Sequence, residues 1–191
     1  RSTSSAASDV YKRQVFDLVE KHRKTGTIIT SNTSGIPIKL MNEGRSDDFK
    51  KCFAITHFFN PPRYLNLFEV VPGPDCKKEI LDFLLDYGEK FLGKTSVLAK
   101  DTPAFIGNRI GIFGIMSLFH QIKNGEYSVE EVDKLTGPAI GRPKSATFRT
   151  ADIAGLDTMC HVANGVYEKC KDDESREVFK LPDFLQKMLD S

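Results

Sequence analysis

Residues 53–71 read FAITHFFNPPRYLNLFEVV, and this stretch decides which class of fold the chain can adopt. The runs at 53–59 and 65–71 are rich in β-branched and aromatic residues, which is typical of buried strands. An Asn-Pro-Pro turn at 60–62 stops the first run, and a Pro-Gly pair at 72–73 stops the second. The stretch therefore predicts two strands with a short connection, which can lie side by side in one sheet.

Similar signals lie on both sides of this stretch. Residues 27–31 (TIITS) and 95–99 each predict a further short strand. Residues 77–92 predict a helix, with Asp75 as its N-cap and Gly93 after its last turn. The expected buried face of this helix consists of Ile80, Phe83, Leu84, Tyr87 and Phe91. Strands and a helix in this order predict an α/β architecture.

Only helical signals follow the last of these strands. Thr102 and Pro103 predict the start of a helix, because threonine is a good N-cap and proline fits the first helical position. Ser128 and Glu131 have the spacing of a capping box, which predicts the start of a second helix. One longer helical segment is expected within 145–170. We therefore predict an all-α second domain.

These patterns divide the chain into three segments. Residues 1–14 (RSTSSAASDVYKRQ) begin without Met and show no buried pattern, so we interpret them as a sequencing artefact or a disordered arm. Residues 15–101 are predicted to form the α/β domain, and residues 102–191 the helical domain. Both ends of the chain are expected to be truncated.

The composition narrows the classes of function. The 191 residues carry 27 Lys and Arg against 26 Asp and Glu, so no basic excess favours a nucleic acid or an anionic membrane as partner. The longest apolar run, 110–119, is too short to cross a bilayer. The four cysteines lack C-x-x-C or metal-ligand spacing, which favours reduced, mostly buried thiols in a cytoplasmic protein without a metal site.

Polar residues interrupt the apolar strands near their ends. Residues 31–35 (SNTSG) follow the first strand, His57 lies in the second, and Glu69 lies in the third. If the second and third strands pair, His57 and Glu69 can meet, and a carboxylate beside an imidazole fixes its tautomer and makes it a general base. The alternatives are a structural histidine, which is common in strands, and a glutamate at an exposed edge.

Four motifs then occur together in one order: SNTSGIPI (31–38), THFFNPPRYLNLFEVV (56–71), DTPAFIGNRI (101–110) and GPAIGRPKSATFRTADIAGLDT (137–158). With these motifs, the chain from residue 15 onward resembles the 3-hydroxyacyl-CoA dehydrogenases of fatty-acid β-oxidation. The last motif is most similar to the bacterial multifunctional type, in which the dehydrogenase is combined with an enoyl-CoA hydratase module.

The resemblance implies a fold and a function. The fold would be an α/β partial Rossmann-type domain at 15–101, followed by the family's all-α C-terminal domain. The function would be that of a fragment of an NAD-dependent enzyme that oxidises (3S)-3-hydroxyacyl-CoA to 3-oxoacyl-CoA. NAD would be the cofactor and acyl-CoA the substrate. The resemblance also implies a homo-oligomer formed through the helical domain, with a hydratase module fused in the full protein.

The resemblance assigns roles to five residues. His57 matches the catalytic histidine, which takes the proton of the 3-hydroxyl group, and Glu69 matches the carboxylate that orients it. Ser34 matches a serine that contacts the substrate oxygen beside the nicotinamide, so it serves both substrate and cofactor. Asn108 matches the asparagine that holds the substrate, and Asn60 matches a residue at the nicotinamide end of the NAD site.

One feature departs from the family pattern. The family binds NAD through a Gly-x-Gly-x-x-Gly turn after its first strand, and this sequence contains no such motif. We therefore expect the isolated chain to bind NAD weakly or not at all and to be inactive. Two alternatives remain open: a non-catalytic dimerisation or substrate-binding remnant, and a related NAD-dependent hydroxyacid dehydrogenase.

Overall fold

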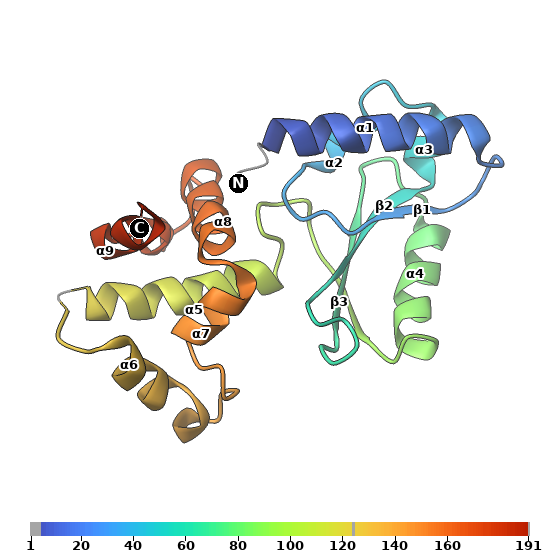
Figure 1. Cartoon of the computed structure of the whole chain (residues 1–191). Coiled ribbons are helices and arrows are strands. Elements are labelled where there is room, and N and C mark those ends of the chain that lie inside the picture. The colour runs from blue at the N-terminus through green and yellow to red at the C-terminus, as the bar shows by residue number, and fades with distance from the viewer. Residues whose placement is uncertain (1–4, 124, 191) are drawn as a thin grey trace. The chain divides into compact units, whose positions relative to one another are not determined.

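The computed structural model describes residues 5–123 and 125–190, which form two compact units. Unit 1 ends at Ile106 and unit 2 begins at Gly107, slightly later than the boundary predicted after residue 101. Unit 1 combines a sheet with helices, whereas the described part of unit 2 contains helices and no strands (Figure 1). The predicted fold class, an α/β domain followed by an all-α domain, is confirmed.

A four-stranded sheet with the order β1-β2-β3-β4 forms the centre of unit 1. Its strands are β1 (Ile29–Ser31), β2 (Phe53–Phe58), β3 (Leu67–Pro72) and β4 (Thr95–Leu98), each overlapping a predicted strand. β1 is parallel to β2, β2 is antiparallel to β3, and β3 is parallel to β4. Because β1 and β2 run in the same direction, their carboxyl ends lie at the same edge of the sheet.

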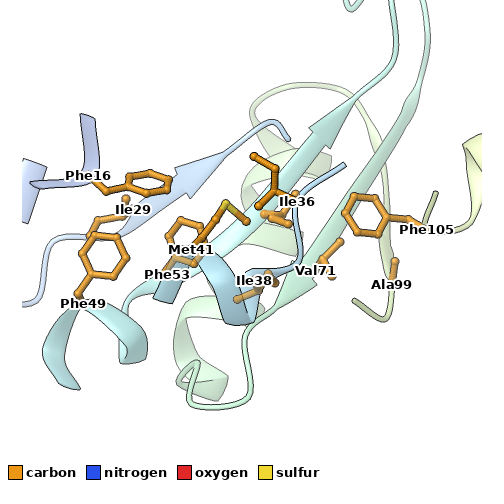
Figure 2. Packing of buried hydrophobic residues seen from close by; sticks show 11 residues of the cluster. Phe16, Ile29, Ile36, Ile38, Met41, Phe49, Phe53, Val71, Ala99 and Phe105 are labelled. Carbon is orange, nitrogen blue, oxygen red and sulfur yellow. The ribbon is translucent and has the colours of Figure 1, made fainter. Parts of the chain in front are cut away.

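Side chains alternate between the two faces of this sheet, and one face packs against the first three helices. These helices are α1 (Ser5–His22), α2 (Ile38–Asn42) and α3 (Asp47–Lys51). In Figure 2 the side chains of Phe16, Phe49 and Phe53 gather at one end of this core, and Ala99 and Phe105 lie at the other end. Three phenylalanine rings therefore fill one end of the core. At the other end, Phe105 lies next to His57, which is described below.

Helix α1 begins inside the segment 1–14, for which no folded structure is expected from the sequence. Residues 5–14 are helical, in contrast to a disordered arm, and residues 1–4 lie outside the described residues. The physical reason lies further along the same helix, where Phe16 is buried and packs with Phe49 and Phe53. This anchor keeps α1 on the sheet, and the helix continues from it toward the N-terminus.

Helix α4 (Lys78–Lys90) covers the other face of the sheet with Ile80, Leu84 and Gly88. A β-carbon added to Gly88 would lie 2.3 Å from Ser96 Oγ and 2.6 Å from Phe68 Cδ1. The absence of a side chain at this position therefore lets the helix lie directly on β3 and β4.

The predicted buried face of α4 is wrong in part. The side chains of Phe83, Tyr87 and Phe91 are 50%, 39% and 74% exposed, and their rings stack on one another along the helix. The reason is that Gly88, rather than these aromatic residues, makes the closest approach to the sheet. The expected N-cap, Asp75, is also wrong, because the helix begins after Lys77 without a side-chain cap.

We expect Gly88→Ala to destabilise unit 1 by about 2–3 kcal/mol, because the added methyl group overlaps the fixed ring of the buried Phe68. Urea unfolding followed by circular dichroism measures this loss. Gly165→Ala is the matched control: this glycine also lies in a helix, but open space surrounds its Cβ position, so the change should stabilise by about 0.5–1 kcal/mol. Equal stability of Gly88→Ala and the unmodified chain would contradict the close packing.

Unit 2 contains the helices α5 (Gly107–Ile122), α6 (Val129–Thr136), α7 (Phe148–Ala154), α8 (Leu156–Lys169) and α9 (Asp183–Asp190), together with two short 3₁₀ turns at Pro138–Ile140 and Arg176–Phe179. Its core consists of Met116, Phe119, Val132, Phe148, Ala151, Met159, Cys160, Ala163 and Leu185. The described part of the chain has no helix long and apolar enough to span a membrane.

One of the three helix predictions for unit 2 is confirmed, and two are wrong. The capping box of Ser128 and Glu131 is present at the start of α6, as predicted. The first helix starts at Gly107 rather than at Thr102, because residues 103–106 form turns. The single helix expected within 145–170 is two helices, because Gly155 adopts a φ of +90°, which a continuous helix does not allow.

Helix α7 obtains its cap from a residue that is distant in sequence. The carboxylate of Asp133, on α6, accepts the backbone N–H groups of Thr147, Phe148 and Arg149 at 3.1, 2.6 and 3.0 Å. These are amides that the first turn of a helix leaves without partners. The contact joins α6 to α7 and fixes where α7 begins.

The four cysteines are free thiols. Cys52 and Cys160 are buried, and Cys76 and Cys170 are partly exposed. Burial raises the pKa of the Cys76 thiol to about 11, with a further contribution from Cys52. Within the ranges 5–123 and 125–190, no group of three or more His, Cys, Asp or Glu side chains is arranged to hold a metal ion.

Candidate functional site

Strands β2 and β3 bring His57 and Glu69 together. The two residues are direct partners in the antiparallel register, and alternation places both on the face that packs against α1, α2 and α3. His57 Nδ1 lies 2.6 Å from Glu69 Oε2. The imidazole is 6% exposed and the glutamate is fully buried. The prediction that these two side chains meet across the strands is confirmed.

This contact determines which nitrogen of His57 can take up a proton. A carboxylate at Nδ1 favours the tautomer in which Nδ1–H donates to it, so the lone pair lies on Nε2. The rings of Phe59 and Phe105 stand edge-on to the imidazole, with centroids 4.7 and 5.5 Å away. The imidazole is therefore held in one orientation, with Nε2 as the ring nitrogen that can accept a proton.

The second oxygen of Glu69 is also engaged. Glu69 Oε1 accepts the backbone N–H of Ile106 at 3.0 Å, across 37 residues of sequence. Ile106 follows a turn in which Ala104 and Phe105 have φ values of +63° and +45°. Residues other than glycine rarely adopt positive φ, and such backbone strain is often found at functional sites. Here the turn places the ring of Phe105 on His57 and the amide of Ile106 on Glu69.

Ser34 lies in the loop 32–37, which follows β1. The loop begins beside the end of β2, because Asn32 Oδ1 accepts the backbone N–H of Phe58 at 2.8 Å. Ser34 is half-buried in this loop. Among the described residues, a hydrogen bond joins His57 to Glu69 directly. Ser34 is placed near the same edge of the sheet by its loop, whose start is bonded to the end of β2.

The two asparagines of the sequence prediction lie in different units. Asn60 follows the end of β2 and is exposed, at the same sheet edge as the loop 32–37. Asn108 belongs to unit 2, where it is half-buried in the first turn of α5. Both asparagines therefore lie at the end of a strand or a helix. Their roles in binding the cofactor and the substrate stay predictions.

The residue after Asn108 fixes the first turn of α5 within unit 2. The guanidinium of Arg109 is hydrogen-bonded to the carboxylate of Asp173, which also accepts the backbone N–H of Ser175 at 2.8 Å. Arg109 lowers the pKa of the Asp173 carboxyl below its ordinary value, and the Ser175 amide adds to this shift. The pair therefore stabilises the folded state as long as Asp173 is ionised.

The stability that this pair contributes is expected to depend on pH. Because the folded pKa is depressed, the contribution is complete above the unfolded value of about 3.9 and is lost as the pH falls through the lower folded value. Asp173→Asn should cost about 1–2 kcal/mol at pH 7 and clearly less near pH 2. Urea unfolding at both pH values measures this, with the neighbouring exposed Asp172→Asn as control. A loss of the same size at both pH values would contradict the ionic role.

Two family models match nearly the whole chain. The model described as "3-hydroxyacyl-CoA dehydrogenase, NAD binding domain" matches residues 8–102. The model described as "3-hydroxyacyl-CoA dehydrogenase, C-terminal domain" matches residues 105–191. The chain belongs to the 3-hydroxyacyl-CoA dehydrogenase family. The two matched ranges divide the sequence close to the boundary between unit 1 and unit 2.

Individual relatives agree with this family. A protein of Bacillus subtilis named "Probable 3-hydroxyacyl-CoA dehydrogenase" is 55% identical over 179 residues, which cover 94% of this chain and 23% of the relative. A Deinococcus radiodurans protein of the same name is 44% identical over 93% of this chain and 51% of its own length. A Rickettsia prowazekii relative, whose name includes "fatty acid oxidation complex trifunctional enzyme", is 30% identical over 94% of this chain and 25% of its own length.

A solved structure also has a similar fold. The crystal structure of (S)-3-hydroxybutyryl-CoA dehydrogenase from Ralstonia eutropha superposes with a TM-score of 0.80 at 26% identity, covering 95% of this chain and 61% of that chain. The chain thus spans about a quarter to three fifths of the length of these relatives.

The residues present in this member of the 3-hydroxyacyl-CoA dehydrogenase family fit one end of an NAD site. Ligands of open α/β sheets bind beyond the carboxyl ends of parallel strands, which is where β1 and β2 carry the loop 32–37 and Asn60. The Gly-x-Gly-x-x-Gly turn that holds the pyrophosphate is not among these 191 residues. The chain therefore supplies polar groups at the edge of the sheet where β1 and β2 end, but not the phosphate-binding turn.

Proposed function

We propose that this chain is the part of an NAD-dependent 3-hydroxyacyl-CoA dehydrogenase that carries its proton-transfer pair. The reaction is the oxidation of (3S)-3-hydroxyacyl-CoA to 3-oxoacyl-CoA in fatty-acid β-oxidation. The observation that carries the proposal is the buried contact of 2.6 Å between His57 Nδ1 and Glu69 Oε2, in a chain of this family.

The geometry supports a role for each group in the proton transfer. When NAD is bound, it supplies the acceptor for the hydride that leaves C3 of the substrate. His57 Nε2 takes the proton of the 3-hydroxyl group, and the carboxylate of Glu69 stabilises the resulting imidazolium. The rings of Phe59 and Phe105 limit the access of water to the imidazole.

In this proposal, three further residues bind and orient the substrate and the cofactor. The hydroxyl of Ser34 hydrogen-bonds the substrate oxygen as it becomes a carbonyl, which is electrostatic stabilisation of the developing charge. Asn60 lines the nicotinamide end of the NAD site, and Asn108 holds the substrate. These roles rest on the family motifs in which the three residues lie.

The partners and the location belong to the same proposal. We infer that the substrate is an acyl-CoA and that unit 2 forms a homo-oligomer. The trifunctional name of the Rickettsia relative supports fusion to a hydratase module in the whole protein. The four free thiols support a cytoplasmic location.

The decisive experiment compares two forms of the protein: the 191-residue chain and the whole protein, meaning the product of the complete reading frame that contains it. Titration calorimetry with NAD should show weak or no binding by the 191-residue chain, because the phosphate-binding turn is not in it. The whole protein should form NADH from 3-hydroxybutyryl-CoA. Turnover of free hydroxy acids but not of acyl-CoA would support a related hydroxyacid dehydrogenase instead. No turnover of either would support a non-catalytic remnant.

A further inference from the structure

We propose that Asp101 is a positioning residue for Ser34, which it serves by holding the loop 32–37 at its far end. The inference rests on the proposed function for the role of Ser34, but the contact itself lies within unit 1 and does not depend on catalysis. Asp101 lies after β4, in the segment 101–106 that also contains Phe105 and Ile106.

The loop that carries Ser34 is fixed at both ends by side-chain acceptors. At its start, Asn32 Oδ1 accepts the N–H of Phe58 at 2.8 Å. At its end, Asp101 Oδ2 accepts the N–H of Ile38, the first residue of α2, at 2.9 Å. A hydrogen bond from a backbone amide to a carboxylate is charge-assisted and is stronger than a bond between neutral groups. Ser34 thus lies between two anchored points.

The segment 101–106 makes one contact with each part of the candidate site. Asp101 bonds the end of the Ser34 loop, Phe105 packs on the imidazole of His57, and Ile106 donates to Glu69. Just before the segment, Ala99 is buried and donates its N–H to Val70 O at 2.9 Å, which fixes the segment to the sheet. One short piece of backbone therefore sets the positions of the serine loop, the base and its carboxylate relative to one another.

The surroundings of Asp101 indicate which substitutions should keep its hydrogen bond to the Ile38 amide. Although the residue is exposed overall, partial desolvation raises the pKa of its carboxyl, and the Ile38 amide opposes this shift. An asparagine keeps an acceptor oxygen without a charge to desolvate. Asp101→Asn should therefore preserve the contact, and Asp101→Ala should remove it.

Amide hydrogen exchange in the 191-residue chain tests the contact. In Asp101→Ala we expect the amide of Ile38, which loses its acceptor, to exchange at least about tenfold faster, while amides of α4 and β3 keep their rates. Asp101→Asn should restore slow exchange. Asp82→Ala, which removes an exposed carboxylate on α4, is the matched control and should leave the rate at Ile38 unchanged. An unchanged rate at Ile38 in Asp101→Ala, or a uniform increase throughout unit 1, would overturn the positioning role.

A double-mutant cycle in the whole protein tests the route through Ser34. Asp101→Ala should lower kcat by about tenfold with little change in KM, and it should cost nothing further in a Ser34→Ala background. Equal losses in both backgrounds would overturn the proposal. If the whole protein shows no dehydrogenase activity at all, the proposed function fails, and the exchange experiment still decides the role of Asp101 in holding the loop.

Discussion

Replacing His57 by alanine in the whole protein is expected to lower kcat by about 10²–10⁴-fold, the usual contribution of a general base. The imidazole is buried, and its Nδ1 is bonded to Glu69, so no other group of the pair can take the substrate proton at the position of Nε2. The measurement is NADH formation from 3-hydroxybutyryl-CoA under saturating conditions.

A matched variant separates this loss from a general effect of removing a histidine. His161, on α8, is exposed, and His161→Ala should keep the activity. Circular dichroism of His57→Ala establishes that the variant is folded. A loss of less than threefold in folded His57→Ala would refute the assignment of this residue as the base.

Glu69 is expected to matter for stability as well as for rate. Its side chain is fully buried, and its two oxygens accept from His57 and from the backbone of Ile106. Glu69→Ala leaves both donors without this acceptor and opens a cavity, so we expect a loss of about 3–5 kcal/mol. Glu69→Gln has nearly the same shape and an oxygen for Ile106, so its loss should be about 1–2 kcal/mol.

Glu69→Ala and Glu69→Gln should differ in their free energy of unfolding but show a similar loss of kcat. Glutamine carries no charge to stabilise the imidazolium, so both changes should lower kcat by at least about tenfold. Urea unfolding of the 191-residue chain and kcat of the whole protein are the two measurements. A glutamine variant with full activity would contradict the electrostatic role, and equal stability of the two variants would contradict the burial of both hydrogen bonds.

The contact between His57 and Glu69 could be predicted because its signals are local. His57 and Glu69 each interrupt a run of apolar residues, and the short connection between the two strands makes antiparallel pairing the natural arrangement. The period-two pattern then puts both side chains on one face. The same local patterns identified all four strands and the capping box of α6.

The surroundings of the pair depend on contacts across many residues. Thr102 and Pro103 have the composition of a helix start, yet the following residues form a left-handed turn. The contacts of Phe105 with His57 and of Ile106 with Glu69 favour that turn, and neither is visible in the local sequence. For the same reason, the sequence could not show that Asp133 caps α7.

The face of a helix that packs on a sheet is likewise not determined by its apolar spacing alone. Phe83, Tyr87 and Phe91 have the spacing of a buried stripe, as do Ile80 and Leu84. Gly88 decides between the two stripes, since only a position without a side chain can approach Phe68 and Ser96 so closely. The spacing of large apolar residues does not show where a glycine allows a helix to approach the sheet closely.

The segment 101–106 lies where the two units join in sequence, and such junctions usually tolerate insertions and deletions. This junction differs, because Asp101, Phe105 and Ile106 each have a fixed partner in unit 1. One residue more or fewer between Asp101 and Ile106 would displace at least one of these three contacts. Related sequences should therefore keep the number of residues between β4 and α5 constant, even where the residues themselves are exchanged.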